Sequence, residues 1–260
     1  MSTPRRTLRK VPEITAYFWI HKVLTTAMGE ATSDFSVREI DPYVAVGLGA
    51  VAFAVAMALQ LSVRRYVAWV YWLAVVMVAV FGTMVADALH IQLGVPYAVS
   101  TAGFALALAA IFIAWYATER TLSIHHITTR RRELFYWATV CATFALGTAT
   151  GDLTAYTLHL GFLASGILFA VVIAVPAIAH RFAALNAVVA FWFAYIVTRP
   201  LGASFADWMG VPRALGGLNW GRGTVAVSLT VVIVGFVGYL SVTRIDIDEK
   251  RGHQPVAEPT

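Results

Sequence analysis

One pattern of residues occurs four times in this chain and most constrains how the chain can fold. In each copy an aromatic residue precedes a tryptophan, a glycine follows ten residues after the tryptophan, and an aspartate follows five residues after the glycine. Successive tryptophans are 53, 65 and 55 residues apart, whereas the spacing inside a copy never changes. Constant internal spacing predicts four copies of one structural unit. The copies are Phe18-Trp19-Gly29-Asp34, Tyr71-Trp72-Gly82-Asp87, Tyr136-Trp137-Gly147-Asp152 and Phe191-Trp192-Gly202-Asp207.

Each copy lies in a long apolar stretch, which predicts a membrane protein. The chain has 260 residues, of which 59% are hydrophobic and 13% are charged, whereas soluble domains carry about 25% charged residues. A helix needs about 20 apolar residues to cross the hydrocarbon core. The stretches are continuous rather than alternating, which favours helices over strands. We therefore expect an all-α polytopic membrane protein with eight transmembrane helices, at residues 14–35, 43–63, 67–90, 97–117, 134–158, 161–179, 184–207 and 223–243.

The basic residues gather in alternate connections between these spans. They precede span 1, separate spans 2 and 3 and spans 4 and 5, and follow spans 6 and 8. Positive charge marks the cytoplasmic side of a membrane protein, so both termini are predicted to be cytoplasmic. The same distribution assigns the net charge of +5 to topology rather than to nucleic acid. The expected partner is the lipid bilayer, and the sequence does not decide whether the protein forms a homo-oligomer.

Each repeat is interpreted as an outward helix that carries the motif and a plainer helix that returns. Two helices per unit make the four repeats parallel, which is one way in which transporters are built. The predicted segments are a cytoplasmic N-terminal segment (1–13), a membrane half with repeats 1 and 2 (14–117), a cytoplasmic basic linker (118–133), a membrane half with repeats 3 and 4 (134–243) and a disordered cytoplasmic tail (244–260).

The four aspartates are the first candidates for function. Asp34, Asp87 and Asp152 come about 18 to 20 residues after the cytoplasmic start of their spans, or about 30 Å at 1.5 Å per residue. They are therefore expected near the outer boundary. Parallel repeats would place them with Asp207 around one axis, where a carboxylate ring attracts cations. Ionisable groups inside a membrane usually mark ion routes. The alternative is structural, with each aspartate bonding a loop amide or a neighbouring helix.

The positions four residues before each aspartate share its helix face. They hold Glu30, Thr83, Thr148 and Ala203. Carboxylate and hydroxyl oxygens suit divalent cations such as Mg²⁺, Ca²⁺ or Mn²⁺, and imidazole shifts the preference toward Mn²⁺, Fe²⁺ or Zn²⁺. Glu30 and Asp34 are also close enough to favour proton exchange. The predicted metal ligands are Asp34, Asp87, Asp152, Asp207, Glu30, His90 and His159.

Two cations lie among these acids. Arg199 is deep inside span 7 and is expected to pair with a carboxylate, as a counter-charge that a substrate cation displaces or as a structural neutraliser. Lys22 is nearer to the cytoplasmic start of span 1, where it could extend its amine to the interface. The repeated glycines are interpreted as helix contacts, and the aromatic-tryptophan pairs as an interfacial belt.

Five segments resemble those of a known family. They are KVPEITAYFW at 10–19, TTAMGE at 25–30, ERTLSIH at 119–125, FALGTATGD at 144–152 and TRPLGAS at 198–204. With them, residues 8–244 are similar to the bacterial "uncharacterised membrane-anchored protein" family of small repeat-containing integral membrane proteins. The resemblance implies a bacterial inner-membrane location and carries no activity or catalytic residue with it.

These observations predict a membrane transporter of cations, foremost a divalent metal such as Mn²⁺ as the substrate, with proton coupling as an option. Its site would comprise the four aspartates with Glu30, Thr83, Thr148 and Arg199. Two alternatives stay open: a carrier of small organic cations, and a non-transporting scaffold or assembly subunit. An enzyme is not expected, because the chain shows no nucleophile–base pair, nucleotide loop or zinc-protease motif.

Overall fold

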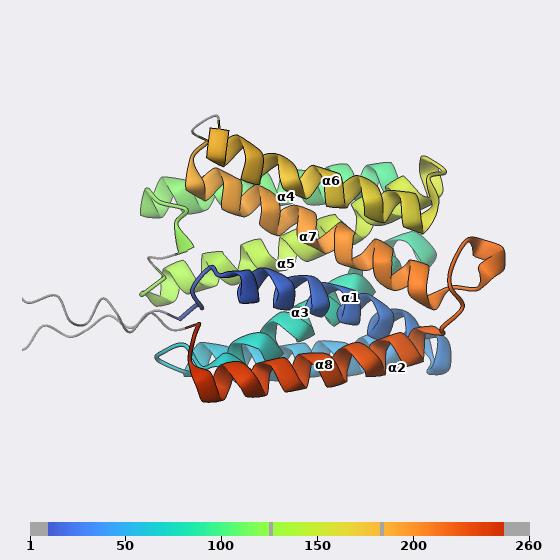
Figure 1. Cartoon of the computed structure of the whole chain (residues 1–260), viewed down its shortest axis with the longest axis horizontal. Coiled ribbons are helices and arrows are strands. Elements are labelled where there is room, and N and C mark those ends of the chain that lie inside the picture. The colour runs from blue at the N-terminus through green and yellow to red at the C-terminus, as the bar shows by residue number, and fades with distance from the viewer. Residues whose placement is uncertain (1–9, 125–126, 183–184, 247–260) are drawn as a thin grey trace, which may run out of the picture.

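In a computed structural model, which describes residues 10–124, 127–182 and 185–246, the chain forms α-helices with short π and 3₁₀ turns and no strand. The prediction of an all-helical protein is confirmed for these residues. The helices lie side by side along one long axis (Figure 1). In the described part they are α1 (Ala16–Glu39), α2 (Pro42–Ser62), α3 (Ala68–Ile91), α4 (Tyr97–Glu119), α5 (Arg130–Asp152), α6 (Gly161–Phe182), α7 (Ala187–Gly210) and α8 (Arg222–Thr243). A π-helical turn, η2 (Leu153–Thr157), continues α5, and a 3₁₀ turn, η3 (Arg213–Leu215), precedes α8.

Several helices begin at residues whose side chains cap them. Thr15 accepts a hydrogen bond from the N–H of Phe18 at the start of α1. Asp41 accepts from two N–H groups of α2 and directly precedes Pro42. Asn186 caps α7 in the same way. These residue types satisfy the free N–H groups of a first helical turn, so the sequence itself sets where these helices start.

The odd-numbered helices form a closed inner ring. α1 packs on α3, α3 on α5, α5 on α7, and α7 on α1. At each contact the motif glycine of one helix lies against a residue of the next helix. That residue comes three positions before the motif glycine of its own helix. A β-carbon at any of these glycines would meet its neighbour at less than normal contact distance, so the predicted packing role is confirmed. The pairs are Gly29 with Ala79, Gly82 with Phe144, Gly147 with Arg199, and Gly202 with Thr26.

The even-numbered helices cover the outside of this ring. α2 packs chiefly on α3, α4 on α5, α6 on α7 and α8 on α1. Each returning helix therefore lies mainly against the helix of the following repeat, and α8 completes the circle by lying beside α1 (Figure 1). The fourfold relation predicted from the spacing is thus visible in both layers.

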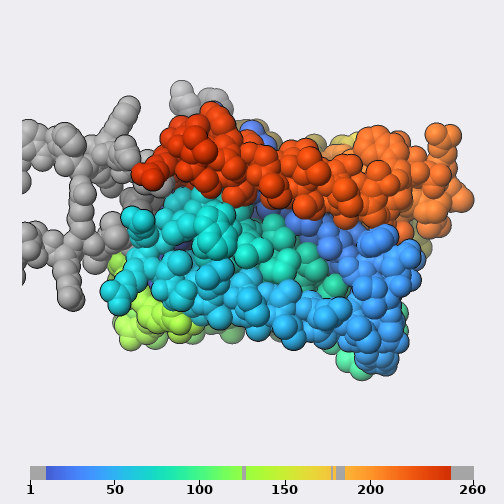
Figure 2. All heavy atoms as spheres, turned by 90° about the horizontal axis from the view of Figure 1, so that it is seen from below, coloured from blue at the N-terminus to red at the C-terminus, as the bar shows by residue number. Residues whose placement is uncertain are grey.

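The outer surface is apolar, as expected for a membrane protein. In the described residues five helices are long and apolar enough to cross a membrane: α2, α3, α4, α7 and α8. Only 17% of the apolar stretch of α2 or α4 is buried, against 61% for α7. Large apolar side chains of α2 and α8 are exposed, and both helices lie on the face of the molecule that Figure 2 shows. A soluble protein would bury such side chains, whereas a lipid-facing helix exposes them.

The aromatic residues of the motif are not an interfacial belt, which corrects the prediction. Most of them are buried at the centre of the bundle, because the four parallel inner helices turn the same motif positions toward one another. Their rings pack edge to face and at tilted angles, as between Phe18 and Trp72 and between Tyr136 and Trp192. Only Trp19 of the eight remains half-buried. The buried members are Phe18, Tyr71, Trp72, Tyr136, Trp137, Phe191 and Trp192.

Candidate functional site

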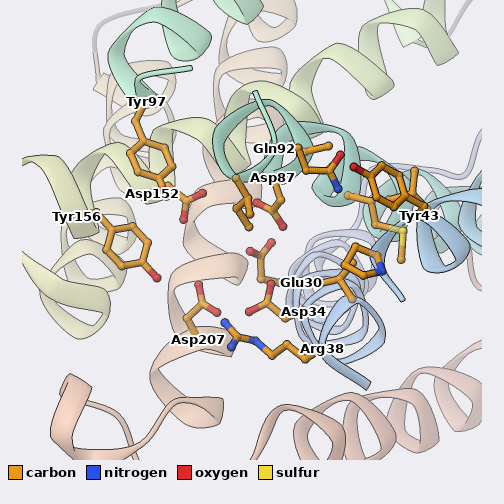
Figure 3. Close-up of a pocket in the computed structure, with 16 residues that line it drawn as sticks. Glu30, Asp34, Arg38, Tyr43, Asp87, Gln92, Tyr97, Asp152, Tyr156 and Asp207 are labelled. Atoms are coloured by element: carbon orange, nitrogen blue, oxygen red, sulfur yellow. The ribbon is translucent and has the colours of Figure 1, made fainter. Parts of the chain in front are cut away.

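The four motif aspartates line one cavity at the end of the inner ring opposite the aromatic residues. The cavity has a volume of about 420 Å³. One aspartate comes from each inner helix, and Glu30 of α1 joins them. Figure 3 shows the five carboxylate groups pointing toward a common space. The sequence prediction that the repeats bring Asp34, Asp87, Asp152 and Asp207 around one axis therefore agrees with the structure.

The aspartates differ in their partners. Asp34 accepts a hydrogen bond from Arg222 Nε at 2.5 Å and forms an ion pair with it. Within the described residues, the carboxylates of Asp87, Asp152 and Asp207 form no hydrogen bond or ion pair. An unpaired carboxylate in an apolar bundle is costly. Three of the four repeats thus present to the cavity a carboxyl group that bonds no other side chain of the described residues.

A single buried arginine, Arg199, lies below these acids and forms the floor of the cavity region, between the acids and the aromatic residues. Arg199 of α7 is fully buried, and its Nη2 donates to Glu30 Oε2 at 2.5 Å. The same nitrogen donates to Thr148 Oγ1 at 2.8 Å and to Thr83 Oγ1. Nη1 donates to the carbonyl oxygen of Thr26 at 3.3 Å. One guanidinium therefore bonds side chains of the three other inner helices, which closes the ring at this level.

The residues around Arg199 are those predicted for the layer beneath the aspartates. Glu30, Thr83 and Thr148 occupy the position four before the aspartate in repeats 1 to 3. The fourth repeat has Ala203, whose small side chain lies on the same helix as Arg199. The expected carboxylate partner of Arg199 is thus Glu30 from the first repeat. Because the guanidinium and the carboxylate neutralise each other, Glu30 is not a free acid in the way that Asp87 and Asp152 are.

Lys22 lies deeper in the ring than the sequence predicts. It does not extend to the interface: the side chain is fully buried, and the amine lies 3.9 Å from the centre of the Phe144 ring and 4.3 Å from that of Tyr195. In the described part of the chain Nζ has no hydrogen-bond partner. The reason is the closed ring, which places α3, α5 and α7 around this face of α1 and leaves no path for the four-carbon side chain to reach the surface.

The two predicted histidine ligands lie away from the cavity. His90 bonds the carbonyl oxygen of Val95 through Nδ1 at 2.9 Å and Ser100 through Nε2 at 3.3 Å, so it joins α3 to α4. His159 is exposed in the turn between η2 and α6, with a positive φ of 56°. Among the described residues, no three histidine, cysteine or acidic side chains lie close enough to hold one metal ion. The structure thus does not assemble the predicted metal-ligand set.

Several cavity residues lie outside the motif and were not predicted as part of the site. Arg38 and Gln92 reach the cavity from the ends of α1 and α3, and Tyr43, Tyr97 and Tyr156 contribute phenol rings (Figure 3). The rings of Tyr97 and Tyr156 stack with centroids 5.7 Å apart. Tyr156 lies in the π-helical turn that follows Asp152, and such turns are frequent at functional sites. Their one sequence signal is their place just after an aspartate helix.

Comparison with known proteins identifies the class by its repeat. The model of the family described as "Repeat of Unknown Function (DUF347)" matches residues 17–66, 70–121, 135–185 and 190–246. Each match covers most of one inner helix and the outer helix that follows it. The chain is therefore a helical membrane protein with four internal repeats, and it belongs to the DUF347 family. No curated protein and no solved structure matches the chain.

Proposed function

We propose that the protein is a membrane transporter of cations and that the carboxylate cavity is its substrate site. The observation that carries the proposal is the presence of Asp87, Asp152 and Asp207 around one cavity without protein partners. Acids that only held helices together would be paired, as Asp34 is with Arg222 and Glu30 is with Arg199. A cation that enters the cavity would supply the missing charge.

The membrane arrangement proposed with this function has eight spans. α1, α5 and α6 would cross the membrane with the five apolar helices, since they run parallel to them over the length of the bundle (Figure 1). The polar residues of α1 and α5 would be tolerated because they face the ring and not the lipid. Both termini would be cytoplasmic in a bacterial inner membrane, which follows from the basic residues and the family resemblance. The cavity would then open toward the outer face.

The cavity favours an organic cation over a bare metal ion. A volume of about 420 Å³ lies within the range of roughly 300–1,000 Å³ that is usual for small-molecule sites. Tyr43, Tyr97 and Tyr156 line the cavity, and an aromatic lining suits ammonium groups. The carboxylates are spread around the space rather than gathered on one point. Divalent metal transport remains the second candidate, because carboxylate oxygens dominate the charge of the cavity.

The test measures binding and transport by the purified protein in lipid. Radiolabelled tetraethylammonium and Mn²⁺ are offered to nanodiscs and to proteoliposomes that contain the wild type, Asp87→Asn or Asp152→Asn. We expect tetraethylammonium to bind and to exchange across the membrane, with affinity reduced at least tenfold in either variant. Glu39→Gln is the matched control, since it removes one acid at the same end of the bundle without removing one from the cavity.

The outcomes separate the candidates. Binding of Mn²⁺ alone, lost in the same variants, replaces the organic cation with the metal. Binding of neither cation, in a protein that is folded and inserted, rejects transport through this site and leaves the scaffold interpretation. Equal loss in Glu39→Gln would show that only the general surface potential matters.

A further inference from the structure

A second set of ionisable groups runs along the axis of the inner ring, away from the cavity. It begins at Lys22, whose amine is fully buried between Phe144 and Tyr195. The Phe144 ring also contacts the guanidinium of Arg199, which lies 5.5 Å from its centre. Lys22 is therefore one layer below the Arg199–Glu30 pair. Glu30 in turn lines the cavity, so few side chains separate the amine from a bound cation.

In the layer that contains Lys22 and Arg199, one of the two cationic side chains has no acidic partner among the described residues. Glu30 is bonded to Arg199, and no acidic side chain in the described residues bonds Lys22. An ammonium group without an acceptor is costly in a dry interior, and cation–π contact with two rings offsets only part of that cost. The equivalent positions in repeats 2 and 3 hold Val75 and Val140, which shows that helix packing at this level does not require an amine.

Tyrosine hydroxyl groups continue from Lys22 toward the end of the ring opposite the cavity. The buried hydroxyl of Tyr195 has no hydrogen-bond partner within the described residues, and the rings of Tyr195 and Tyr136 both pack against Trp192. Tyr136 and Tyr71 share a hydrogen bond of 2.5 Å between their hydroxyl groups. The ring of Tyr71 lies 5.7 Å from that of Tyr66. These tyrosines come from α7, α5, α3 and the α2–α3 connection; Tyr195, Tyr136 and Tyr71 are fully buried, and Tyr66 is partly buried.

The series ends at a buried carboxylate. Tyr66 donates a hydrogen bond to Asp246 Oδ2, while Oδ1 of Asp246 has no partner in the part of the chain that the structure describes. Burial raises the pKa of the Asp246 carboxyl above its usual value. Asp246 follows α8, and its carbonyl accepts a hydrogen bond from the N–H of Glu13, which places it at the end where α1 begins.

We propose that Lys22 is a proton-transfer group and that the tyrosine series carries its proton between Lys22 and Asp246, so that cation movement is coupled to proton movement. The coupling rests on the proposed function, whereas the proton-transfer role of Lys22 does not. A cation in the cavity repels the ammonium form. One N–H bond of Lys22 then breaks, its electron pair stays on nitrogen, and the proton passes to a tyrosine oxygen. Each hydroxyl hands its own proton onward to the Asp246 carboxylate, which releases a proton at that end of the ring, and Lys22 regains a proton from the cavity side after the cation has left.

Other ionisable groups near Lys22 set the field in which it exchanges its proton. Arg199 repels the ammonium form, and Glu30 compensates Arg199. His21, the neighbour of Lys22 in sequence, turns toward Trp72 and Phe236 instead, with ring centroids 4.0 and 5.0 Å away. The other titratable groups on the surrounding inner helices are His21 and Glu30 of α1, Tyr71 of α3, Tyr136 and Cys141 of α5, and Tyr195 and Arg199 of α7.

The first test needs no substrate. The sequence contains three lysines, Lys10, Lys22 and Lys250, so protein labelled with ¹⁵N-lysine gives three Nζ signals in a nanodisc. Lys10→Arg and Lys250→Arg assign the Lys22 signal by elimination and leave the ring intact. We expect that signal to change between the ammonium and the amine form within the pH range over which the protein stays folded. A Lys22 signal that keeps one protonation state throughout this range overturns the proposal.

The second test measures coupling with Lys22→Val, which gives repeat 1 the residue of repeats 2 and 3. In proteoliposomes an imposed pH gradient should drive tetraethylammonium, or Mn²⁺ if that is the bound cation, to accumulate with the wild type. The variant should bind the cation at least as tightly, because no ammonium group opposes it, and should exchange it downhill, with accumulation reduced at least tenfold. Wild-type accumulation in Lys22→Val overturns the proposal. If the wild type binds neither cation, the proposed function fails, and the lysine signal still decides whether Lys22 exchanges a proton.

Discussion

The two ends of the inner ring are built from the same four helices and the same repeated motif, yet they differ in packing. At one end the motif places aromatic side chains, which fill the axis and exclude water. At the other end it places aspartates, which surround a cavity of about 420 Å³. Arg199 and its partners separate the two. The comparison shows that one repeated motif can fill one end of a helical ring with aromatic side chains and line a cavity with carboxyl groups at the other end.

The largest effect is expected at the boundary between these ends. Arg199→Met leaves Glu30 buried without its counter-charge, and removal of one partner of a buried pair costs about 3–5 kcal/mol. Thermal unfolding of the purified variant should show this loss. The double variant Arg199→Met with Glu30→Met should recover most of it, because no charge is left behind. A single variant as stable as the wild type would show that the two ends do not depend on this floor.

A somewhat smaller effect is expected where the ring closes between the first and last repeats. A side chain at Gly202 would meet Thr26 of α1, so Gly202→Val should destabilise the fold by about 1–3 kcal/mol through overpacking. Gly238→Ala is the control, since a β-carbon there meets nothing within 4 Å. It should stabilise α8 by up to about 1 kcal/mol, the helix preference of alanine over glycine. Equal unfolding temperatures for the two variants would argue against a tightly closed ring.

Within the cavity, paired and unpaired aspartates should respond in opposite directions. Asp34→Asn weakens the bond to Arg222, and the loss should be about 1 kcal/mol or less, as for other partly exposed pairs. Asp152→Asn removes an unpaired charge and should leave the protein equally stable or more stable. Chemical denaturation of both variants measures the difference. A loss of stability in Asp152→Asn would reveal that this acid has a structural partner, and it would weaken the proposed site.

At the aromatic end, the smallest predicted effect depends on pH. Burial raises the pKa of Asp246 above its ordinary value of 3.8, so the folded state keeps this proton after the unfolded state has lost it. Stability from this group is therefore present below pH 3.8 and is lost as the pH rises toward the folded-state pKa. Asp246→Asn keeps an acceptor for Tyr66 and should remove this pH dependence. Unfolding curves measured from pH 4 upward should converge for the two proteins at the acidic limit.

The sequence predicted those site residues whose level along the helix axis follows from their spacing within a repeat. Equal spacing within each copy is enough to place Asp34, Asp87, Asp152 and Asp207 at one level, and the same argument places Glu30 beneath them. The partner of Arg199 could not be predicted in this way. Glu30 is 169 residues away in sequence, and only the lateral order of the helices decides that α7 lies beside α1.

The wrong predictions have a common physical cause. Each treated a helix as if lipid or water surrounded it on every side. Lys22 was given the option of extending to the interface and the motif aromatics were placed in a belt, yet the closed ring encloses Lys22 and seven of the eight aromatics. His90 was assigned to the site because of its distance from Asp87 along the helix, whereas the carbonyl oxygen of Val95 in the following turn binds its ring. Tertiary closure, which no single repeat encodes, overrode these local patterns.

The closure of the ring by α8 and α7 against α1 also has a consequence for synthesis of the protein. Thr26 and Thr198, which join α1 to α7 through a hydrogen bond, are 172 residues apart, so the first helix made must wait in the membrane for the last ones. Until then the acids of α1 have neither Arg199 nor Arg222 beside them. A chain that stops before α7 would thus lack not only Asp207 but also both arginines that bond the acids of α1.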